Sequence, residues 1–314
     1  MCYQPLGLSF FIMILSYTYV KENIMQKYLI ITDTCANLTD ETINKYQIPL
    51  ISLSFIYNDK VFKSYENGKS TDLKAYYELL RNKERITTSA VNSDEVFTFF
   101  NNFLKEGYDI LYIGFSSKLS NTFNICKLEL EYLIKKYPDR KILYVDSLSG
   151  SLGQGLLVEK AYELKVSNKT IDEIFIWLER NKLKVLHLFT VESLYHFFQG
   201  GRVSRASYFI SNILDIKPIL HCTIEGRLEV IGKAIGRKRS LLNIVNRLVD
   251  NITNPKEQMI YIAHADCIDS VEVIKKLILE KIEVKGFVVN NVDLVVGAHA
   301  GPGTIALFFF GENR

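Results

Sequence analysis

The segment GAHAGPG, residues 297–303, places three glycines, a proline and one histidine between two apolar runs. Glycine has no Cβ, so the backbone N–H groups of such a segment can approach a ligand closely, and proline fixes the turn. His299 is the one side chain in this segment that can donate a hydrogen bond or carry a charge near neutral pH. The segment therefore predicts either an anion-binding loop or an ordinary tight turn whose histidine faces water.

The segment SSKLSNT, residues 116–122, carries more hydroxyl groups than one helix start needs. Ser116, Ser117 and Ser120 stand between an expected strand and an expected helix. Ser120 or Asn121 can cap that helix, which leaves the other hydroxyl groups in surplus. Helix starts attract anions, because their unpaired N–H groups and the helix dipole point outward. The segment is therefore a candidate anion site.

A second hydroxyl-rich segment, RITTSAVNS, spans residues 85–93. Thr88 and Ser89 lie in an extended run there, and Asn92 or Ser93 can cap the helix that follows. In open α/β sheets, ligands lie beyond the carboxyl ends of parallel strands, which is where this chain places its small polar residues. Thr88 and Ser89 are therefore further candidates for an anion site.

The sequence leaves the roles of two charged residues open. Asp33 follows an expected strand and either takes part in a site or caps a loop, which is the more common use. Arg202 emerges from the glycine pair of QGGRVS. It is either a structural charge on a turn or presents its guanidinium group to an acidic group of a ligand or partner. Ser204 is predicted to cap the helix that follows.

Composition and missing motifs exclude several classes of protein. The net charge of the 314 residues is only +3, with basic and acidic residues interspersed, which argues against a nucleic-acid surface. The five cysteines lie far apart without a CxxC pair, so the sequence predicts neither a disulfide framework nor a zinc site and favours a reducing cytoplasm. GxxxxGK, HExxH and GxSxG motifs are missing, and GSLGQG lacks dinucleotide-binding spacing. We therefore expect no metal and no cofactor.

The alternation of short apolar runs with amphipathic segments predicts an α/β protein with two domains. We expect a Rossmann-like N-terminal domain with a parallel sheet at 25–185 and a C-terminal α/β domain with a mixed sheet and fewer long helices at 186–314. A cleft between two such domains is the usual place for a ligand. The expected strands are 27–32, 109–114, 141–146, 215–220, 227–235, 259–265, 286–296 and 304–310, and the expected helices of the first half are 93–107 and 121–137.

The apolar stretch Leu6–Val20 near the start resembles the core of a signal peptide. A positive residue before it and a small-residue cleavage site after it are both missing, and it is shorter than the ~20 residues of a membrane-spanning helix. We expect Met25 to open the functional domain and residues 1–24 to be an extension outside the fold. A short membrane anchor is the alternative.

Taken together, these motifs resemble the DegV family of bacterial fatty-acid-binding proteins, which includes the fatty-acid-carrier subunits of fatty acid kinase. The resemblance covers Met25 to Gly311, with three departures from the family pattern: Ala90 and Val91 replace Gln and Pro, Asn121 replaces Gly, and Ile235 stands where a second basic residue is often seen. The segments that carry the resemblance are ITDTCANLTDE, TTSAVNS, SSKLSNTF, VDS followed by GQG, GGRVS, ILDIKPIL and GAHAGPG.

The resemblance implies a non-enzymatic, two-domain carrier that encloses one long-chain fatty acid, with the carboxylate in the inter-domain cleft and the acyl chain buried. It implies a kinase partner that phosphorylates the bound carboxylate to an acyl phosphate for phospholipid synthesis, and Arg202 is the candidate for docking that partner. We also expect a monomer without stable membrane insertion. Carried onto matching positions, the residues around the carboxylate would be Thr88 or Ser89, one or more of Ser116, Ser117 and Ser120, and His299.

Two rival hypotheses come from other classes. An acyl- or phospho-transfer enzyme would use His299 or a serine as the covalent carrier, although a serine nucleophile needs a nearby histidine that the sequence alone does not place. A DNA-binding regulator is disfavoured by the small net charge and the missing helix-turn-helix pattern.

Overall fold

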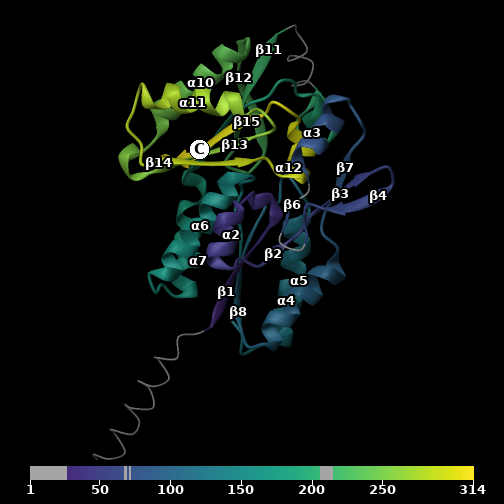
Figure 1. Ribbon diagram of the computed structural model, residues 1–314. Helices are drawn as coiled ribbons and strands as arrows, with labels where there is room; N and C mark the ends of the chain where they lie inside the picture. The colour runs from purple at the N-terminus through teal and green to yellow at the C-terminus, as the bar shows by residue number, and fades with distance from the viewer. Residues whose placement is uncertain (1–26, 67–68, 71, 206–214) are drawn as a thin grey trace, which may run out of the picture.

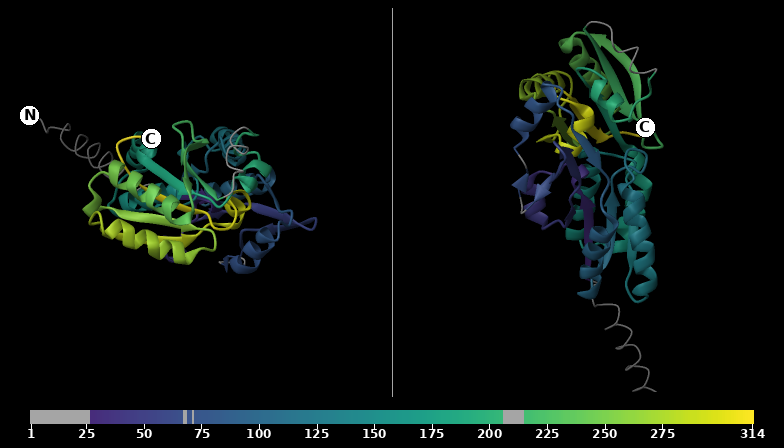
Figure 2. Two further views of the ribbon diagram at one scale, coloured as in Figure 1. Left: turned by 90° about the horizontal axis from the view of Figure 1, so that it is seen from above. Right: turned by 90° about the vertical axis from the view of Figure 1, so that its right-hand side faces the viewer.

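The chain folds into an elongated α/β molecule whose two main sheets lie towards opposite ends (Figures 1 and 2). This architecture confirms the predicted fold class. The expected extension 1–24 lies outside the described residues, as does the body of the helix expected after Ser204. The computed structural model describes residues 27–66, 69–70, 72–205 and 215–314.

The first sheet has four parallel strands in the order β2-β1-β8-β9. Its three longer strands coincide with the apolar runs expected at 27–32, 109–114 and 141–146. Side chains alternate between the two faces of a strand. One face accordingly packs against α4 and α5, and the other packs against α6 and α7 (Figure 1). The bounds are β1 Tyr28–Asp33, α2 Asp40–Tyr46, β2 Leu50–Ile51, α4 Ser93–Lys105, β8 Asp109–Gly114, α5 Thr122–Lys136, β9 Ile142–Asp146, α6 Leu152–Val166 and α7 Ile171–Asn181.

The helices of this half begin at the polar residues that the sequence marks as caps. Asn92 caps α4 and Thr39 caps α2, each by accepting a hydrogen bond from a backbone N–H of the first turn. At the start of α5 the cap position is Asn121, but the hydroxyl of Ser120 accepts from the backbone N–H of Thr122, at 3.2 Å. Ser120 is therefore used locally as well as being a candidate site residue.

The second sheet is mixed and has six strands in the order β12-β11-β10-β15-β13-β14. Only β13 and β14 pair in parallel. In the described residues this half has fewer long helices than the first, as expected, and its long helices α10 and α11 cover the outer face of the sheet with buried aliphatic side chains (Figure 1). The bounds are β10 Val185–Thr190, β11 Ile216–Cys222, β12 Leu228–Ile235, α10 Arg237–Asn251, β13 Met259–His264, α11 Ile268–Leu279, β14 Gly286–Asn291 and β15 Ile305–Phe310.

Helix α6 joins the two halves through a shared core. It contacts β1 and β8 of the first sheet and β10, β13 and β15 of the second. A helix with a sheet on either side needs apolar or small residues all round, and the seven residues 152–158 are all buried. Gly155 meets the carbonyl oxygen of Ala36 so closely that an added Cβ would lie 2.5 Å from it. The halves are therefore packed together rather than connected loosely.

A smaller antiparallel sheet, β4-β3-β7, and three short helices flank this junction (Figures 1 and 2). Helix α3 carries Tyr76 and Tyr77, whose hydroxyl groups donate to the backbone carbonyls of Leu294 and Val292, at 2.6 and 2.8 Å. The bounds are β3 Ser54–Tyr57, β4 Lys60–Lys63, β5 Tyr65–Glu66, β6 Lys69–Ser70, α3 Leu73–Arg81, β7 Thr87–Ser89, α8 Tyr195–Gln199 and α12 Leu294–Ala300.

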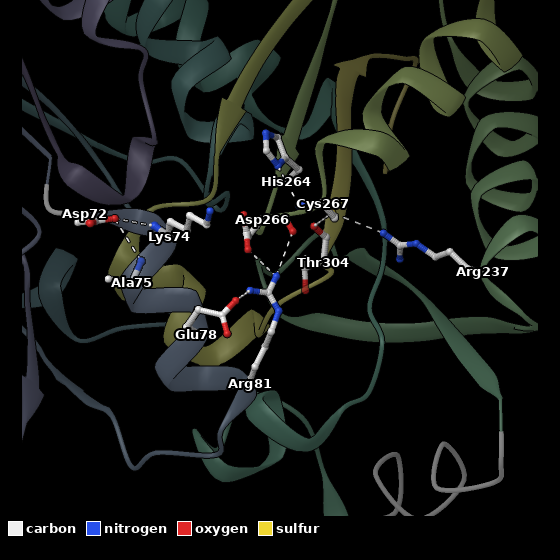
Figure 3. A network of polar contacts seen from close by, with 10 residues as sticks. All are labelled: Asp72, Lys74, Ala75, Glu78, Arg81, Arg237, His264, Asp266, Cys267 and Thr304. Atoms are coloured by element: carbon white, nitrogen blue, oxygen red, sulfur yellow. Dashed lines mark hydrogen bonds and ion pairs between the residues drawn. The ribbon is translucent and has the colours of Figure 1, made fainter.

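An ion pair adds a charged contact between the halves. Arg81 at the end of α3 lies 2.5 Å from the carboxylate of Asp266, which follows β13, and 2.7 Å from that of Glu78 (Figure 3). All three side chains are partly exposed, so the pair contributes only modestly to stability, at most about 1 kcal/mol. Its consequence is positional, since it fixes α3 against the second half.

The segment around His299 departs from the sequence expectation. The strand expected at 286–296 ends at Asn291, and the next residues form α12, so His299 lies in the last turn of a short helix rather than in a loop. Asp293 begins this helix by accepting from the backbone N–H of Val296, at 2.8 Å. The glycines of GAHAGPG still have the expected use after the helix, because Gly301 and Gly303 adopt positive φ.

None of the helices in the described ranges combines the length and apolarity needed to cross a bilayer.

Candidate functional site

A cavity of about 280 Å³ lies where the two halves meet. Its wall combines β10 and β15 of the second sheet with α12, α8, β7 and the segments that precede α5 and α6. Most of the wall is apolar, so the cavity suits a hydrocarbon better than a sugar or nucleotide. Representative apolar lining residues are Phe115, Leu119, Phe189, Phe197, Val296 and Phe308.

Five polar residues of the lining gather in one part of the cavity and form what we call the polar cluster: Thr88, Ser89, Ser120, Arg202 and His299. The hydroxyl oxygen of Thr88 lies 2.9 Å from Nε2 of His299. The other ring nitrogen faces Gly200, whose carbonyl accepts from Arg202. Arg202 also donates to the carbonyl of Leu119, next to Ser120, at 3.0 Å. A continuous set of contacts thus connects the cluster.

The strand β7 presents Thr88 at the cavity wall. Thr87–Ser89 pairs antiparallel with β3, with Thr88 opposite Phe55. β7 is at the edge of its sheet, so this pairing fixes the strand on one side only. The Thr88 hydroxyl pairs with a side chain, Nε2 of His299, rather than with nearby backbone.

His299 is held as a neutral imidazole. Burial lowers its pKa to about 3, and the nearby Arg202 and His196 act in the same direction. Its Nδ1 has no hydrogen-bond partner among the described residues. Gly200 packs against this nitrogen so tightly that an added Cβ would lie 1.9 Å away, which explains why glycine stands there. At neutral pH the ring therefore supplies one donor and one acceptor.

Arg202 supplies the positive charge of the cluster. It is half-buried, and burial lowers its pKa. Its two hydrogen-bond acceptors, the carbonyls of Leu119 and Gly200, are uncharged. No carboxylate in the described part of the chain forms an ion pair with it. A half-buried cation without a protein counter-ion is a favourable place for an anionic ligand.

Two of the predicted residues lie outside the lining. The hydroxyl of Ser116 is fully buried and donates to the carbonyl of Gly226, at 2.8 Å. Ser117 contributes its backbone N–H to the carboxylate of Asp146, at 3.3 Å. Neither hydroxyl reaches the cavity wall, so Ser116 and Ser117 do not belong to the polar cluster.

Asp33 has a structural use in the fold. Its buried carboxylate accepts from the backbone N–H groups of Cys35 and Phe115 and from the hydroxyl of Tyr112, at 3.1, 2.9 and 3.0 Å. Burial raises its pKa to about 6, although these hydrogen bonds oppose the shift. Asp33 therefore connects the end of β1 to the end of β8 rather than lining the cavity.

Sequence reasoning missed three polar residues of the lining, His187, Ser151 and Thr304. The Thr304 hydroxyl donates to the carbonyl of Ala300, at 2.8 Å. His187 lies on β10 and is 5% exposed, and Ser151 immediately precedes α6 and is 7% exposed. Within the described ranges, Nε2 of His187 and the Ser151 hydroxyl have no hydrogen-bond partner. A histidine inside the apolar run VLHLFT was a usable signal for the first; nothing in GSLGQG distinguishes the second.

The described residues include no group of three or more His, Cys, Asp and Glu side chains placed to hold a metal ion.

Comparison with known proteins gives a family and a shared fold. The family model described as "Uncharacterised protein, DegV family COG1307" matches residues 27–312. The DegV domain-containing protein CPE0026 of Clostridium perfringens is 40% identical over 290 residues, which is 92% of this chain and 99% of the relative.

Solved structures agree with this similarity. A structure described as DegV, a fatty acid binding protein from Bacillus subtilis, is 25% identical, with a TM-score of 0.77, covering 91% of this chain and 100% of that one. The fatty acid binding DegV family protein SAG1342 of Streptococcus agalactiae is 27% identical, with a TM-score of 0.78 and coverage of 92% and 100%. A DegV family protein of Thermus thermophilus has a TM-score of 0.82 at 24% identity, with coverage of 91% and 100%.

Proposed function

The chain belongs to the DegV family, and from that premise we propose that it binds one long-chain fatty acid. The acyl chain occupies the cavity, and the carboxylate lies in the polar cluster. One observation carries the proposal: an apolar cavity contains a half-buried arginine that no carboxylate of the described residues neutralises. A fatty acid would fill the apolar cavity with its hydrocarbon chain and neutralise the arginine with its carboxylate.

The hydrogen-bonding pattern of the cluster suits a carboxylate. An ionised carboxylate only accepts hydrogen bonds, so its neighbours must donate. If Nε2 of His299 donates to the Thr88 oxygen, the Thr88 hydroxyl hydrogen is free to donate to the ligand. The hydroxyls of Ser89 and Ser120 and the guanidinium group of Arg202 are further donors in the same lining. We therefore assign Arg202 to the carboxylate rather than to partner docking.

The hydrocarbon supplies most of the binding free energy. Burial of each CH₂ group contributes about 0.8 kcal/mol, so a tail of about sixteen carbons gives a gross gain of roughly 12 kcal/mol. The cost of immobilising the ligand reduces this gain considerably. The cluster then determines orientation and selects for an anionic head group.

The relatives support this proposal by what they bind. Structures from Bacillus subtilis and Streptococcus agalactiae are described as fatty acid binding, at 25% and 27% identity to this chain. Both are covered over their whole length, so the likeness includes both halves and the junction that holds the cavity.

The cluster supports a carrier better than an enzyme. Thr88 and His299 have the spacing of a nucleophile and its base, but no third group in the described chain orients Nδ1 of the histidine. Ser116 and Ser117 do not contact a histidine through their hydroxyl groups. The kinase partner, the monomeric state and the location in the cytoplasm remain predictions.

Mass spectrometry tests the proposal directly. The purified full chain is extracted with organic solvent, and the extract and the stripped protein are analysed, the latter before and after addition of palmitate or oleate. We expect co-purified long-chain fatty acid, and uptake of one added molecule per chain. A protein that arrives empty and takes up neither acid would overturn the proposal. A stable acyl or phosphoryl adduct on His299 or a serine would favour the transferase instead.

A further inference from the structure

A second polar group lies in the cavity wall, formed by His187 and Ser151, and the polar cluster does not include it. Both residues line the cavity, and both are more than nine-tenths buried. Nε2 of His187 and the Ser151 hydroxyl have no hydrogen-bond partner within the described residues, not even each other. Buried polar atoms are almost always hydrogen-bonded in folded proteins. Two such atoms in the wall of an apolar cavity therefore point to a ligand group that pairs with them.

The ring of His187 is held firmly in place. His187 lies on β10 opposite Phe308 of β15, and the two rings make an edge-on contact with centroids 5.2 Å apart. Its Nε2 faces Gly153 in the first turn of α6, where an added Cβ would lie 2.3 Å away. Ser151 is two residues before that glycine, at the N-cap position of α6, and lines the same cavity. The site is preorganised by packing rather than by hydrogen bonds.

This group is separate from the polar cluster. His187 and Phe189 are on the same face of β10, about 7 Å apart along the strand, with Phe189 between His187 and the end of the strand at Thr190. The charges that act on His187 are Arg314 and His221, whereas those that act on His299 are Arg202 and His196. An acyl chain anchored at the cluster would therefore reach His187 with its methylene groups, not with its carboxylate.

The protonation state of His187 decides which chemistry it can recognise. Burial, with Arg314 and His221, lowers its pKa well below the usual value, so the ring is neutral at physiological pH. A neutral imidazole offers one donor and one acceptor, and the Ser151 hydroxyl offers both as well. A second carboxylate could not satisfy the acceptor nitrogen. A hydroxyl group satisfies both kinds of atom, because it donates and accepts.

We propose that His187 and Ser151 form a subsite for an oxygen-bearing acyl chain, so that the protein selects hydroxy fatty acids over unsubstituted ones of equal length. This inference rests on the proposed function and adds the substrate class. An unsubstituted chain leaves Nε2 of His187 and the Ser151 hydroxyl unpaired beside methylene groups, whereas a hydroxyl at the matching carbon can donate to the first and accept from the second. The preference therefore depends on where along the chain the hydroxyl lies.

A competition experiment tests the subsite. The delipidated full chain is given equimolar mixtures of stearic acid and one hydroxystearic acid, with the hydroxyl at successive carbons in different mixtures, and native mass spectrometry reads the ratio bound. We expect an enrichment of about tenfold at one or two adjacent positions and none elsewhere, the size of a hydrogen bond gained without loss of burial. Equal uptake of stearic acid and every isomer would overturn the subsite.

Variants separate the subsite from general effects on packing. His187→Leu should abolish the enrichment, and His187→Gln, which keeps a donor and an acceptor, should retain part of it. Ser151→Ala should lower it. Thr190→Val is the matched control, because Thr190 is a buried polar residue on the same strand β10 and lies outside the cavity lining; it should leave the ratio unchanged. If His187→Leu fails to fold, His187→Gln and the positional profile of the unaltered chain still decide.

The outcomes also distinguish this inference from the proposed function. Uptake of no fatty acid at all would contradict the proposed function. Tight uptake of every acid with a flat positional profile would leave fatty acid binding intact and contradict the subsite alone. An enrichment that survives His187→Leu would show that other residues select the hydroxyl, which also overturns the assignment.

Discussion

Two hydroxyl-rich segments of this chain look alike in sequence and have different uses in the fold. In Thr87–Ser89 the Thr88 hydroxyl meets His299 at the cavity wall, at 2.9 Å. In the segment that begins at Ser116, the first hydroxyl is buried against the carbonyl of Gly226, at 2.8 Å. The backbone explains the difference. The first segment is an edge strand held by its pairing with β3, while the second is a turn in which Ser116 and Ser120 accept from nearby backbone N–H groups.

A surplus of hydroxyl groups therefore does not by itself mark a binding site: Ser116 lies outside the cavity lining, and Ser120 lines it although its oxygen accepts from the backbone N–H of Thr122. The residues of the cavity wall that we expect to bind a ligand are those whose polar atoms have few protein partners, such as Arg202 and His299. Substitutions in the two segments should therefore separate binding from stability.

Loss of the positive charge should weaken binding most. Arg202→Met removes the only charged donor of the polar cluster, and we expect the Kd for palmitate to rise about a hundredfold, the equivalent of about 3 kcal/mol. Isothermal titration calorimetry measures it. Arg202→Lys keeps the charge but not the fork of donors, so its Kd should lie in between. The control is Arg247→Met, on α10 outside the lining; equal losses in both methionine variants would break the assignment.

Lowering the pH should reduce the free energy of unfolding of the unaltered protein more than that of a variant without His299. The folded pKa of His299 is about 3, and that of an unfolded histidine is about 6.5. Above pH 6.5 neither state binds the proton. Between 6.5 and 3 only the unfolded chain does, so the free energy of unfolding falls as pH falls. At pH 5 this amounts to about 2 kcal/mol.

Denaturant unfolding of the unaltered chain and of His299→Gln, each at pH 7 and pH 5, measures this effect. The variant lacks the titrating ring, so its stability relative to the unaltered chain should improve by up to that amount at pH 5. Asp33, Asp293 and His187 titrate in both proteins and cancel in the difference. A difference that does not change with pH would contradict the buried, neutral state of His299.

Ser116→Ala should lower stability without changing affinity. Its hydroxyl donates to a buried carbonyl, so its removal leaves that acceptor unpaired and costs about 1–3 kcal/mol in the free energy of unfolding. Urea denaturation measures the loss, and titration with palmitate should give an unchanged Kd. A raised Kd with an unchanged free energy of unfolding would place Ser116 in the binding site and reverse the comparison between the two segments.

Thr88→Val should have the opposite effect to Ser116→Ala: it should weaken binding modestly with little change in stability. Valine fills the same space without the hydroxyl, so we expect the Kd for palmitate to rise about tenfold, with little change in unfolding. Thr87→Val is the matched control, because Thr87 is the exposed neighbour in the same strand and does not line the cavity. Its Kd should equal that of the unaltered chain, and a tenfold loss in both variants would remove Thr88 from the site.

Local patterns predicted the fold well. The buried strands at 27–32, 109–114 and 141–146 and the caps Thr39 and Asn92 follow from short apolar runs and single polar residues, which act within a few residues of themselves. Helix α12 is the exception: its first residues fall in the strand expected at 286–296 and the rest in the loop expected at 297–303, because seven residues are too few to show a helical period. Asp293 was the available sign of its start.

The site was harder to predict, because it depends on which segments the fold brings together. Thr88 and His299 are 211 positions apart, and nothing local says that they touch. Their pairing was expected only through resemblance to a family. The use of the Ser116 hydroxyl likewise depends on a contact with Gly226, which lies 110 positions further along the chain. His187 was missed because a lone histidine in an apolar strand is far more often a core residue than a ligand-binding one.

The most direct test of fatty acid binding at the polar cluster is a crystal structure of the full chain with a fatty acid that carries bromine at its methyl end. Anomalous scattering locates the bromine, and the electron density locates the carboxylate. We predict the carboxylate within hydrogen-bonding distance of Thr88 and Arg202 and the bromine deep among the apolar residues of the cavity. A carboxylate placed elsewhere, or a cavity that stays empty at saturating ligand, would contradict the account.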